Sequence, residues 1–362
     1  MNYYFHVPFC RSKCGYCAFY SEPHPTPRMI GRYLDRIESD LEEYEPEGPC
    51  ETINFGGGTP TLLSTAQLER LFRAIEKRLK PEKTTEISIE ANPETLDREK
   101  VQLIRSFANR ISLGVQSFRP KFRDTLGRDC CQKALRQAIE LIAEAKFPHW
   151  NCDLIYAIPG QKGADFRHDL EEAFATGADH VSCYNLTPEE GARLSDRLIP
   201  DEEDSVKMWK KAGELAEAAG FHRYEISNYA KKNGECRHNV NVWRGGLLKG
   251  FGPAAASFDG KKRSIQPESI RSWLRRSVPE FDEIPLEDRL NEIFIINLRT
   301  TNGWTPKLWK SVPDADSWHR RVEAARKAAS KTSDSFFEIS SHRIRLTEEG
   351  MLFWNSVAES II

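Results

Sequence analysis

The sequence predicts an α/β fold in which six parallel strands alternate with helices and form a partial, open (β/α)6 barrel. The main observation is a series of six short apolar or β-branched runs, most of them separated by segments with helical periodicity. Consecutive strand–helix units produce a parallel sheet with the helices outside, and six units are fewer than the eight of a closed barrel. The predicted strands are residues 3–7, 52–55, 86–90, 110–115, 152–157 and 180–186.

The helices between these strands are predicted from apolar stripes and capping residues. Residues 30–41 carry apolar side chains at positions i, i+3, i+4, i+7 and i+11, which is typical of an amphipathic helix. Ser64 and Gln67 have the spacing of a capping box that opens a second helix. Residues 134–145 and 166–175 show the same helical pattern.

After about residue 200 the pattern changes, which predicts a separate C-terminal part. A helix is expected over residues 205–219, and a more helical region begins near Pro285. That region ends with a hairpin-like segment and a last helix opening at Thr347, an order also compatible with a winged helix. We therefore predict three units. They are a barrel over residues 1–230, a connecting segment over residues 231–284 and a small helical, winged-helix-like domain over residues 285–362.

Cys10, Cys14 and Cys17 follow the first predicted strand with the spacing Cys-x3-Cys-x2-Cys. Three thiolates so close together can hold three corners of a [4Fe-4S] cluster and leave the fourth iron open. A structural zinc site would need four ligands, and no second Cys or Cys/His pair follows at the required spacing. A disulfide framework is disfavoured because the nine cysteines are scattered and odd in number. The others are expected to be buried small hydrophobic residues: Cys50, Cys130, Cys131, Cys152, Cys183 and Cys236.

The composition indicates a protein of a reducing compartment with no strong charge preference. Lys and Arg total 52 against 54 Asp and Glu, so no basic excess points to nucleic acid. No apolar run reaches the roughly 18 residues that a membrane span requires, and the first residues lack a signal-peptide pattern. We expect a cytoplasmic protein with no integral membrane segment and no nucleic-acid partner.

A glycine loop and several polar residues follow the predicted strands at their carboxyl ends, where α/β folds place their sites. Residues 54–60 read Asn-Phe-Gly-Gly-Gly-Thr-Pro, and such exposed backbone groups could bind the ammonium and carboxylate of an amino acid. The loop is neither a phosphate loop nor a dinucleotide-binding fingerprint. Glu90 is placed to bind ribose hydroxyls or an ammonium, and Gln116, Arg128 and Asp153 occupy similar positions.

Several motifs together resemble the coproporphyrinogen III oxidase-like family of radical S-adenosylmethionine (SAM) proteins. They are residues 4–10, 56–63, 89–93, 110–118 and 224–230, together with His238-Asn239, and they extend the similarity over nearly the whole chain. The resemblance implies a [4Fe-4S] cluster on Cys10, Cys14 and Cys17 whose open iron is bound by the methionine part of SAM. It also implies SAM contacts at Tyr4, Gly57, Gly58, Thr59, Glu90, Gln116, Arg128, Asp153 and Thr187.

Within this family the chain resembles the heme-chaperone branch more than the coproporphyrinogen oxidases. Those oxidases carry another Cys two residues beyond the third ligand, where this chain has Phe19. They also have an N-terminal extension, whereas the cysteine motif here begins at residue 10. The chaperones carry a His-Asn-x-x-Tyr-Trp motif implicated in heme binding. At the matching positions, His238 and Trp243 imply an axial imidazole and a ring packed on the porphyrin.

Three positions depart from the pattern of that branch. Val242 replaces the Tyr of the heme motif, and Cys130 stands where the family often has His. Ala256 replaces another His in the glycine-rich stretch 250–257. These changes remove polar or ligating groups near the expected porphyrin cavity, whereas the cluster and SAM positions are intact.

The resemblance implies a heme chaperone that binds heme and a SAM-ligated [4Fe-4S] cluster and passes heme to an acceptor protein. The alternative is a radical SAM enzyme that forms a 5′-deoxyadenosyl radical and abstracts hydrogen from a porphyrinogen or another substrate. Such an enzyme would need an electron donor such as a flavodoxin or ferredoxin. A third hypothesis, nucleic-acid binding by the C-terminal domain, is disfavoured because the charges of residues 306–350 are balanced. The sequence leaves open whether SAM is cleaved.

Overall fold

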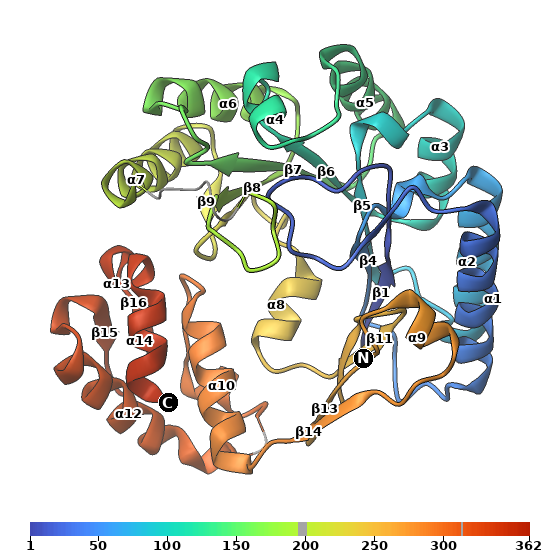
Figure 1. The fold of residues 1–362 in the computed structure, drawn as a ribbon. Helices are drawn as coiled ribbons and strands as arrows, with labels where there is room; N and C mark the ends of the chain where they lie inside the picture. Colours follow the sequence, from blue (N-terminus) through green and yellow to red (C-terminus); the bar gives the residue numbers. More distant parts are fainter. Residues whose placement is uncertain (195–200, 313) are drawn as a thin grey trace.

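A computed structural model describes residues 1–194, 201–312 and 314–362 (Figure 1). Its centre is a mixed sheet, which among the described residues has the strand order β14-β13-β12-β11-β1-β4-β5-β6-β7-β8-β10-β9. The six predicted strands are confirmed as neighbouring parallel strands of this sheet. They are β1 (Asn2–Val7), β4 (Thr52–Gly57), β5 (Glu86–Ala91), β6 (Arg110–Gln116), β7 (His149–Tyr156) and β8 (His180–Asn185).

Helices lie along the outer side of the curved sheet, as Figure 1 shows. They are α1 (Pro27–Glu43), α2 (Thr65–Leu79), α3 (Arg98–Phe107), α4 (Pro120–Thr125), α5 (Gln132–Ala145), α6 (Gly163–Ala175) and α7 (Glu202–Ala218). The predicted capping box of Ser64 and Gln67 opens α2, and Thr26 caps α1 by accepting a hydrogen bond from the Met29 N–H. The helical stripe of residues 30–41 is buried against the sheet.

Side chains alternate along the barrel strands, and this alternation separates an apolar outer core from a polar interior. On the outer side, Phe5 stacks between Phe55 and Phe251, with ring centroids 5.2 and 5.0 Å away. The intervening positions carry polar side chains that are nevertheless buried, which is unusual for a sheet packed under helices. Those on the barrel strands include Asn2, His6, Thr52, Glu86, Ser88, Arg110, Asn151, His180 and Ser182.

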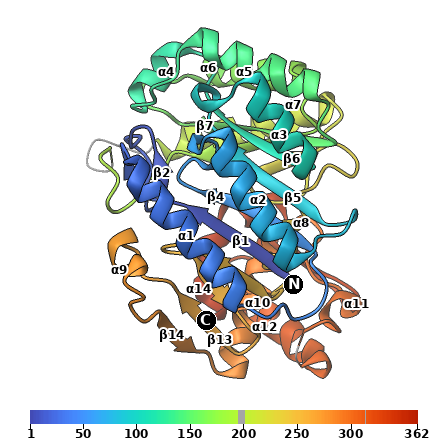
Figure 2. The same ribbon diagram turned by 90° about the vertical axis from the view of Figure 1, so that its right-hand side faces the viewer.

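Further strands extend the sheet beyond both edges of the barrel. β11 (Leu248–Phe251) pairs in parallel with β1, and β12 (Ala256–Phe258), β13 (Lys262–Ile265) and β14 (Glu280–Glu283) follow in antiparallel order. At the other edge, β10 (Asn228–Ala230) pairs with β8, and β9 (His222–Arg223) pairs with β10. Two short helices accompany these strands. α8 (Arg237–Trp243) lies in the opening of the curved sheet in Figure 1, and α9 (Ile270–Leu274) lies beside α1 in Figure 2.

The C-terminal part is helical, as expected, and contains the predicted hairpin. Its elements are α10 (Leu286–Leu298), α11 (Pro306–Trp309), α12 (Trp318–Lys331), β15 (Phe337–Ile339), β16 (Ile344–Leu346), α13 (Glu348–Leu352) and α14 (Trp354–Ile361). Thr347 caps α13, so the predicted start of the last helical segment is confirmed. The domain boundaries at residues 230 and 284 stay predictions.

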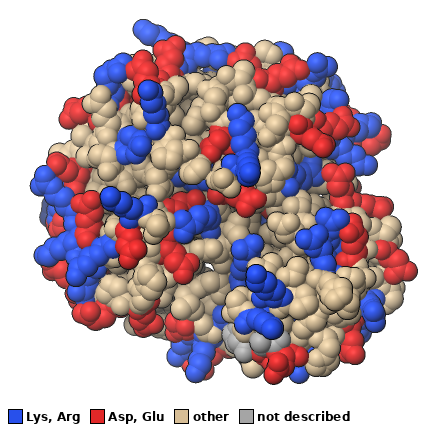
Figure 3. Space-filling model, turned by 180° about the vertical axis from the view of Figure 1, so that it is seen from behind, with Lys and Arg blue, Asp and Glu red and all other residues tan. Residues whose placement is uncertain are grey.

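Two further observations concern the charges on the surface and the length of the helices. Figure 3 shows Lys and Arg side chains interspersed with Asp and Glu over the face opposite to that of Figure 1, with no broad area of one sign. Among the described residues, every helix is too short or too polar to cross a bilayer.

Candidate cluster and cofactor site

The cysteine loop leaves the carboxyl end of β1 and is held in place on two sides. Its base is a short parallel pairing of β2 (Phe9–Cys10) with β3 (Glu22–Pro23). Its tip is held through Gly15, whose N–H donates to the Leu126 carbonyl at 2.9 Å and whose carbonyl accepts from the Leu194 N–H at 2.8 Å. A Cβ at Gly15 would lie 2.7 Å from the Leu194 side chain, so only glycine fits there. The loop therefore holds its three cysteines half-buried at the edge of the barrel.

The surroundings of the three thiols suit a cluster of thiolate-bound irons. Burial is the main cause that raises the pKa of Cys10 and of Cys17, so these thiols keep their protons until a metal displaces them. The Arg128 guanidinium lies 4.0 Å from the Cys14 sulfur, so a cation stands beside the cysteine loop. No group of three described ligand residues converges on a single ion, and a cubane does not require this because each thiolate binds a different iron.

The glycine loop after β4 lies close against other parts of the same rim. Gly57 has a φ of +100°, and a Cβ there would lie 2.4 Å from the His6 ring. Cβ atoms at Gly56 and Gly58 would lie 2.6 Å from the Glu90 carboxylate and 2.7 Å from the Phe9 backbone. The three glycines are therefore needed for close packing at the rim, whatever ligand their backbone also meets.

Glu90 and Asp153 face the same polar space from β5 and β7. Burial, reinforced by the nearby charge of Asp153, raises the pKa of Glu90 to about 8. Burial likewise raises the pKa of Asp153, although hydrogen bonds from Ser112 at 2.9 Å and Asn151 at 2.7 Å oppose this. Two carboxyl groups that oppose each other's ionisation favour a ligand with a positive charge or with several hydroxyls. SAM carries both, so this pair fits the cofactor.

Gln116, Arg128 and Gly114 meet at the end of β6. The strand register shifts between Gly114 and Gln116, and Gln116 has a φ of +65°, which is rare outside glycine. Arg128 donates to the Gly114 carbonyl at 2.7 Å, and its buried Nε has no partner in the described chain. An orphaned donor beside a strained strand end is compatible with a ligand at this position.

Tyr4 and Thr187 occupy different environments on the same side of the barrel. The Tyr4 hydroxyl lies 3.3 Å from His6 Nδ1, and burial raises its pKa. Thr187 lies beyond β8, is exposed and donates to Glu189 at 3.2 Å. The structure thus brings Tyr4, the glycine loop, Glu90, Gln116, Arg128 and Asp153 around one rim, and it leaves Thr187 at the surface.

His238 and Trp243 lie at the opposite end of the barrel. His238 is buried in α8, and its ring Nδ1 lies 2.7 Å from the hydroxyl of Thr52, the first residue of β4. Its backbone N–H donates to Glu86, the first residue of β5. Burial lowers the pKa of His238 to about 4. Trp243 is half-buried under the Arg299 guanidinium, 5.0 Å from its ring. The structure does not bring these two residues together with the cysteines.

Two groups at these barrel ends were not predicted from the sequence. His6 holds the rim together through Tyr4, the Tyr20 carbonyl and close contact with Gly57. Glu86 and Arg110 form a buried ion pair of 3.2 Å at the amino end, near α8. The sequence did contain a signal for both groups, because polar residues alternate with apolar residues along these strands.

Comparison with known proteins agrees with these features. Residues 4–173 match the Radical SAM superfamily. A protein of Synechocystis sp. named heme chaperone HemW is 33% identical over 91% of this chain and 84% of its own length. The HemW of Mycobacterium tuberculosis is 32% identical over 99% of this chain and 94% of its own length.

A solved structure shares the fold. Coproporphyrinogen III oxidase (HemN) from Escherichia coli, a radical SAM enzyme, has a TM-score of 0.83 over 99% of this chain and 89% of its own, at 19% identity. Radical SAM proteins bind a [4Fe-4S] cluster and SAM, which agrees with the three cysteines and with the polar rim. Together with the relatives above, these findings show that the chain belongs to the HemW family of radical SAM proteins.

Proposed function

We propose that this protein is a heme chaperone, which binds heme, holds a SAM-ligated [4Fe-4S] cluster and passes the heme to an acceptor protein. The observation that carries the proposal is similarity over 91% and 99% of the chain to two proteins named heme chaperone HemW. Phe19 stands at the position where the oxidases have a further Cys, which favours the chaperone over the oxidase. Its side chain is 71% exposed.

Cys10, Cys14 and Cys17 would hold the cluster, which supplies an open iron for SAM and, when reduced, an electron. Arg128 would offset the thiolate charge at Cys14, because its guanidinium lies 4.0 Å from that sulfur. Glu90 and Asp153 would bind the cationic and hydroxyl groups of SAM, with Tyr4 beside them. The glycine loop packs closely against His6 and Phe9, which fixes its position on this rim.

For heme, the proposed contacts are His238 and Trp243. The Thr52 hydroxyl donates to Asn2 Oδ1 at 2.8 Å, so it accepts from His238 Nδ1–H and leaves the lone pair on Nε2. The low pKa of His238 keeps this imidazole neutral, as an axial ligand must be. Because His238 is only 6% exposed, iron binding at Nε2 requires α8 to move away from β4.

The test is a titration of the anaerobically reconstituted protein with heme, followed through the Soret band. We expect a saturable Soret band at a fixed heme-to-chain ratio and weaker binding by His238→Ala, because the variant lacks the axial imidazole. His222→Ala is the matched control, since His222 is exposed and its ring hydrogen-bonds to Glu235 at 2.9 Å. Thermal midpoints and iron content of both variants show whether they fold.

A protein that holds its cluster and shows no specific Soret band would contradict the proposal. The radical-enzyme alternative would then be tested by 5′-deoxyadenosine production coupled to porphyrin decarboxylation.

A further inference from the structure

An open groove lies between the first turns of α1 and the short helix α9, which Figure 2 shows side by side. Its volume is about 490 Å³. α1 contributes Arg28 and Arg32, and α9 with the residue after it contributes Arg271 and Arg275. Within each pair the two arginines are four residues apart and therefore lie on one helix face. Two pairs of cations thus line the same space, and no acidic residue is among its lining residues.

The four guanidinium groups of this arginine groove are exposed and have no hydrogen bond or ion pair with any described residue. Carboxylates on α1 are engaged elsewhere. Asp35 and Glu38 both accept from Arg70 of α2, at 2.7 and 2.5 Å. Four cations without counter-charges attract an anionic ligand, and the attraction is strongest where a cavity limits solvent screening.

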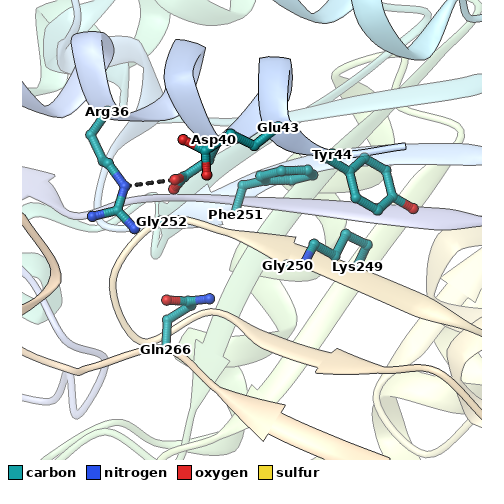
Figure 4. Close-up of a pocket in the computed structure, with 9 residues that line it drawn as sticks. All are labelled: Arg36, Asp40, Glu43, Tyr44, Lys249, Gly250, Phe251, Gly252 and Gln266. Carbon is teal, nitrogen blue, oxygen red and sulfur yellow. Dashed lines mark hydrogen bonds and ion pairs between the residues drawn. The ribbon is translucent and has the colours of Figure 1, made fainter. Parts of the chain in front are cut away.

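A second pocket on the same helix shows the opposite arrangement. Figure 4 shows Arg36 pointing to Asp40 in this pocket of about 250 Å³, and their ion pair measures 2.6 Å. Its other cation, Lys249, lies over the rings of Tyr44 and Phe251 at 5.3 and 5.6 Å. Here each cation already has a partner in the chain. Of these two pockets, the arginine groove is the one whose cations lack partners among the described residues.

The groove is apolar between its cations. Met29 and Leu274 are half-buried, Ile270 is buried, and all three line the groove. The start of α1 adds to the preference for anions, because this long helix has no acidic residue in its first turn. A matching ligand has an apolar body and two or more carboxylates, and the cavity volume lies in the range of small-molecule sites.

The groove is also tied to the cysteine loop. The Ile270 N–H donates to the Tyr20 hydroxyl at 2.7 Å, and Tyr20 lies three residues after Cys17. It is therefore on the side of the molecule that carries the cluster, whereas His238 is buried at the amino end of the strands.

We infer that the arginine groove binds the propionate carboxylates of a tetrapyrrole, with the macrocycle against Met29 and Leu274. The choice of a tetrapyrrole rests on the proposed function. The groove itself is a site separate from His238. Each guanidinium can form a bidentate pair with a carboxylate, so recognition depends on propionates rather than on iron.

The test compares two double variants, R28Q/R32Q and R271Q/R275Q, with the wild type and with a control, R73Q/R167Q. The control removes the same charge from exposed positions of α2 and α6. Three ligands are titrated: heme with two propionates, coproporphyrin III with four, and the dimethyl ester of protoporphyrin with none free. We expect each groove variant to bind heme about tenfold or more weakly than the wild type does, and to lose at least as much affinity for coproporphyrin III. The affinity for the ester should not change. The control should bind as the wild type does.

Equal affinity of wild type and groove variants for heme and for coproporphyrin III would overturn the inference. If heme binding is then lost only in His238→Ala, the proposed function stands without the groove. If heme fails to bind any protein while coproporphyrin III binds the wild type and not the groove variants, the groove inference holds and the heme-chaperone proposal fails.

Discussion

The two ends of the barrel are built from the same strands and differ in how their buried acidic side chains are paired. At the amino end, Glu86 accepts from Arg110 and from two backbone N–H groups of α8. His180 lies there between Asn151 at 2.7 Å and the Tyr224 hydroxyl at 2.8 Å. At the carboxyl end, Glu90 has no cationic partner among the described residues, and burial is the main cause that raises its pKa to about 8. At the amino end the Glu86 carboxylate is paired in a buried network that stabilises the fold, although Arg110 Nη1 lacks a hydrogen-bond partner among the described residues. At the carboxyl end the Glu90 carboxyl lacks such a pairing, which favours a cationic ligand there.

The largest effect is expected from the cluster ligands. Serine at Cys10, Cys14 or Cys17 should reduce the iron of the reconstituted protein from about four atoms per chain to nearly none, because two thiolates cannot hold the cluster. Cys131→Ser is the control, since this cysteine is exposed rather than buried as expected, and its sulfur accepts a hydrogen bond from the Ala134 N–H at the start of α5. Iron and sulfide analysis measures the outcome. Full iron retention in a ligand variant would contradict the assignment.

At the amino end, Glu86→Gln should lower the free energy of unfolding by about 3 kcal/mol, because Arg110 would lose its buried counter-charge. The cluster content should not change if the two ends are independent. Denaturant unfolding of the apo protein measures the first effect. Glu69→Gln breaks an exposed pair with Arg73 and should cost about 0.5 kcal/mol or less. Cluster loss in Glu86→Gln would show that the ends are coupled.

Gly57→Ala should weaken SAM binding about tenfold or more, because a Cβ would displace the His6 ring and the backbone there has a positive φ. The reconstituted protein with its cluster is titrated with SAM by calorimetry. Gly31→Ala is the control, since a Cβ at that position of α1 meets nothing within 4 Å. Equal SAM affinity in both variants would remove the glycine loop from the site.

The smallest effect concerns pH. The folded apo protein keeps the Glu90 proton up to a pH of about 8, whereas the unfolded carboxyl loses it near 4.5. The contribution of this group to stability is therefore greatest below pH 4.5 and falls as the pH rises to about 8. Glu90→Gln should unfold about 2 °C higher than the wild type at pH 9 and nearly equally at pH 5. A pH-independent difference between the two would mean that Glu90 is ionised in the folded protein.

Much of the fold was predictable because its signals are local. The alternation of apolar runs with helical stripes predicts all six barrel strands, and the Ser64 capping box fixes the start of α2. The addition of β11 to β14 beside β1 was not predictable. It depends on pairing between residues some 240 positions apart, such as Tyr4 with Gly250, and no local pattern encodes this.

The site was predictable to the extent that its residues follow strand ends. This rule brings the cysteines, the glycine loop, Glu90 and Gln116 to one rim. His238 shows the limit of motif reading, because its contacts with Thr52 and Glu86 place it at the other end of the barrel. The arginine groove depends on α9 lying beside α1, a contact between distant segments.

The most direct test of the proposed function is to follow the heme itself. The reconstituted protein, loaded with one heme and supplied with SAM and a reductant, is mixed with excess apomyoglobin. The heme-chaperone account predicts that the tetrapyrrole reaches apomyoglobin with its mass unchanged and that no 5′-deoxyadenosine accumulates in step with transfer. A tetrapyrrole of altered mass, formed together with 5′-deoxyadenosine, would contradict it and identify the protein as a radical enzyme.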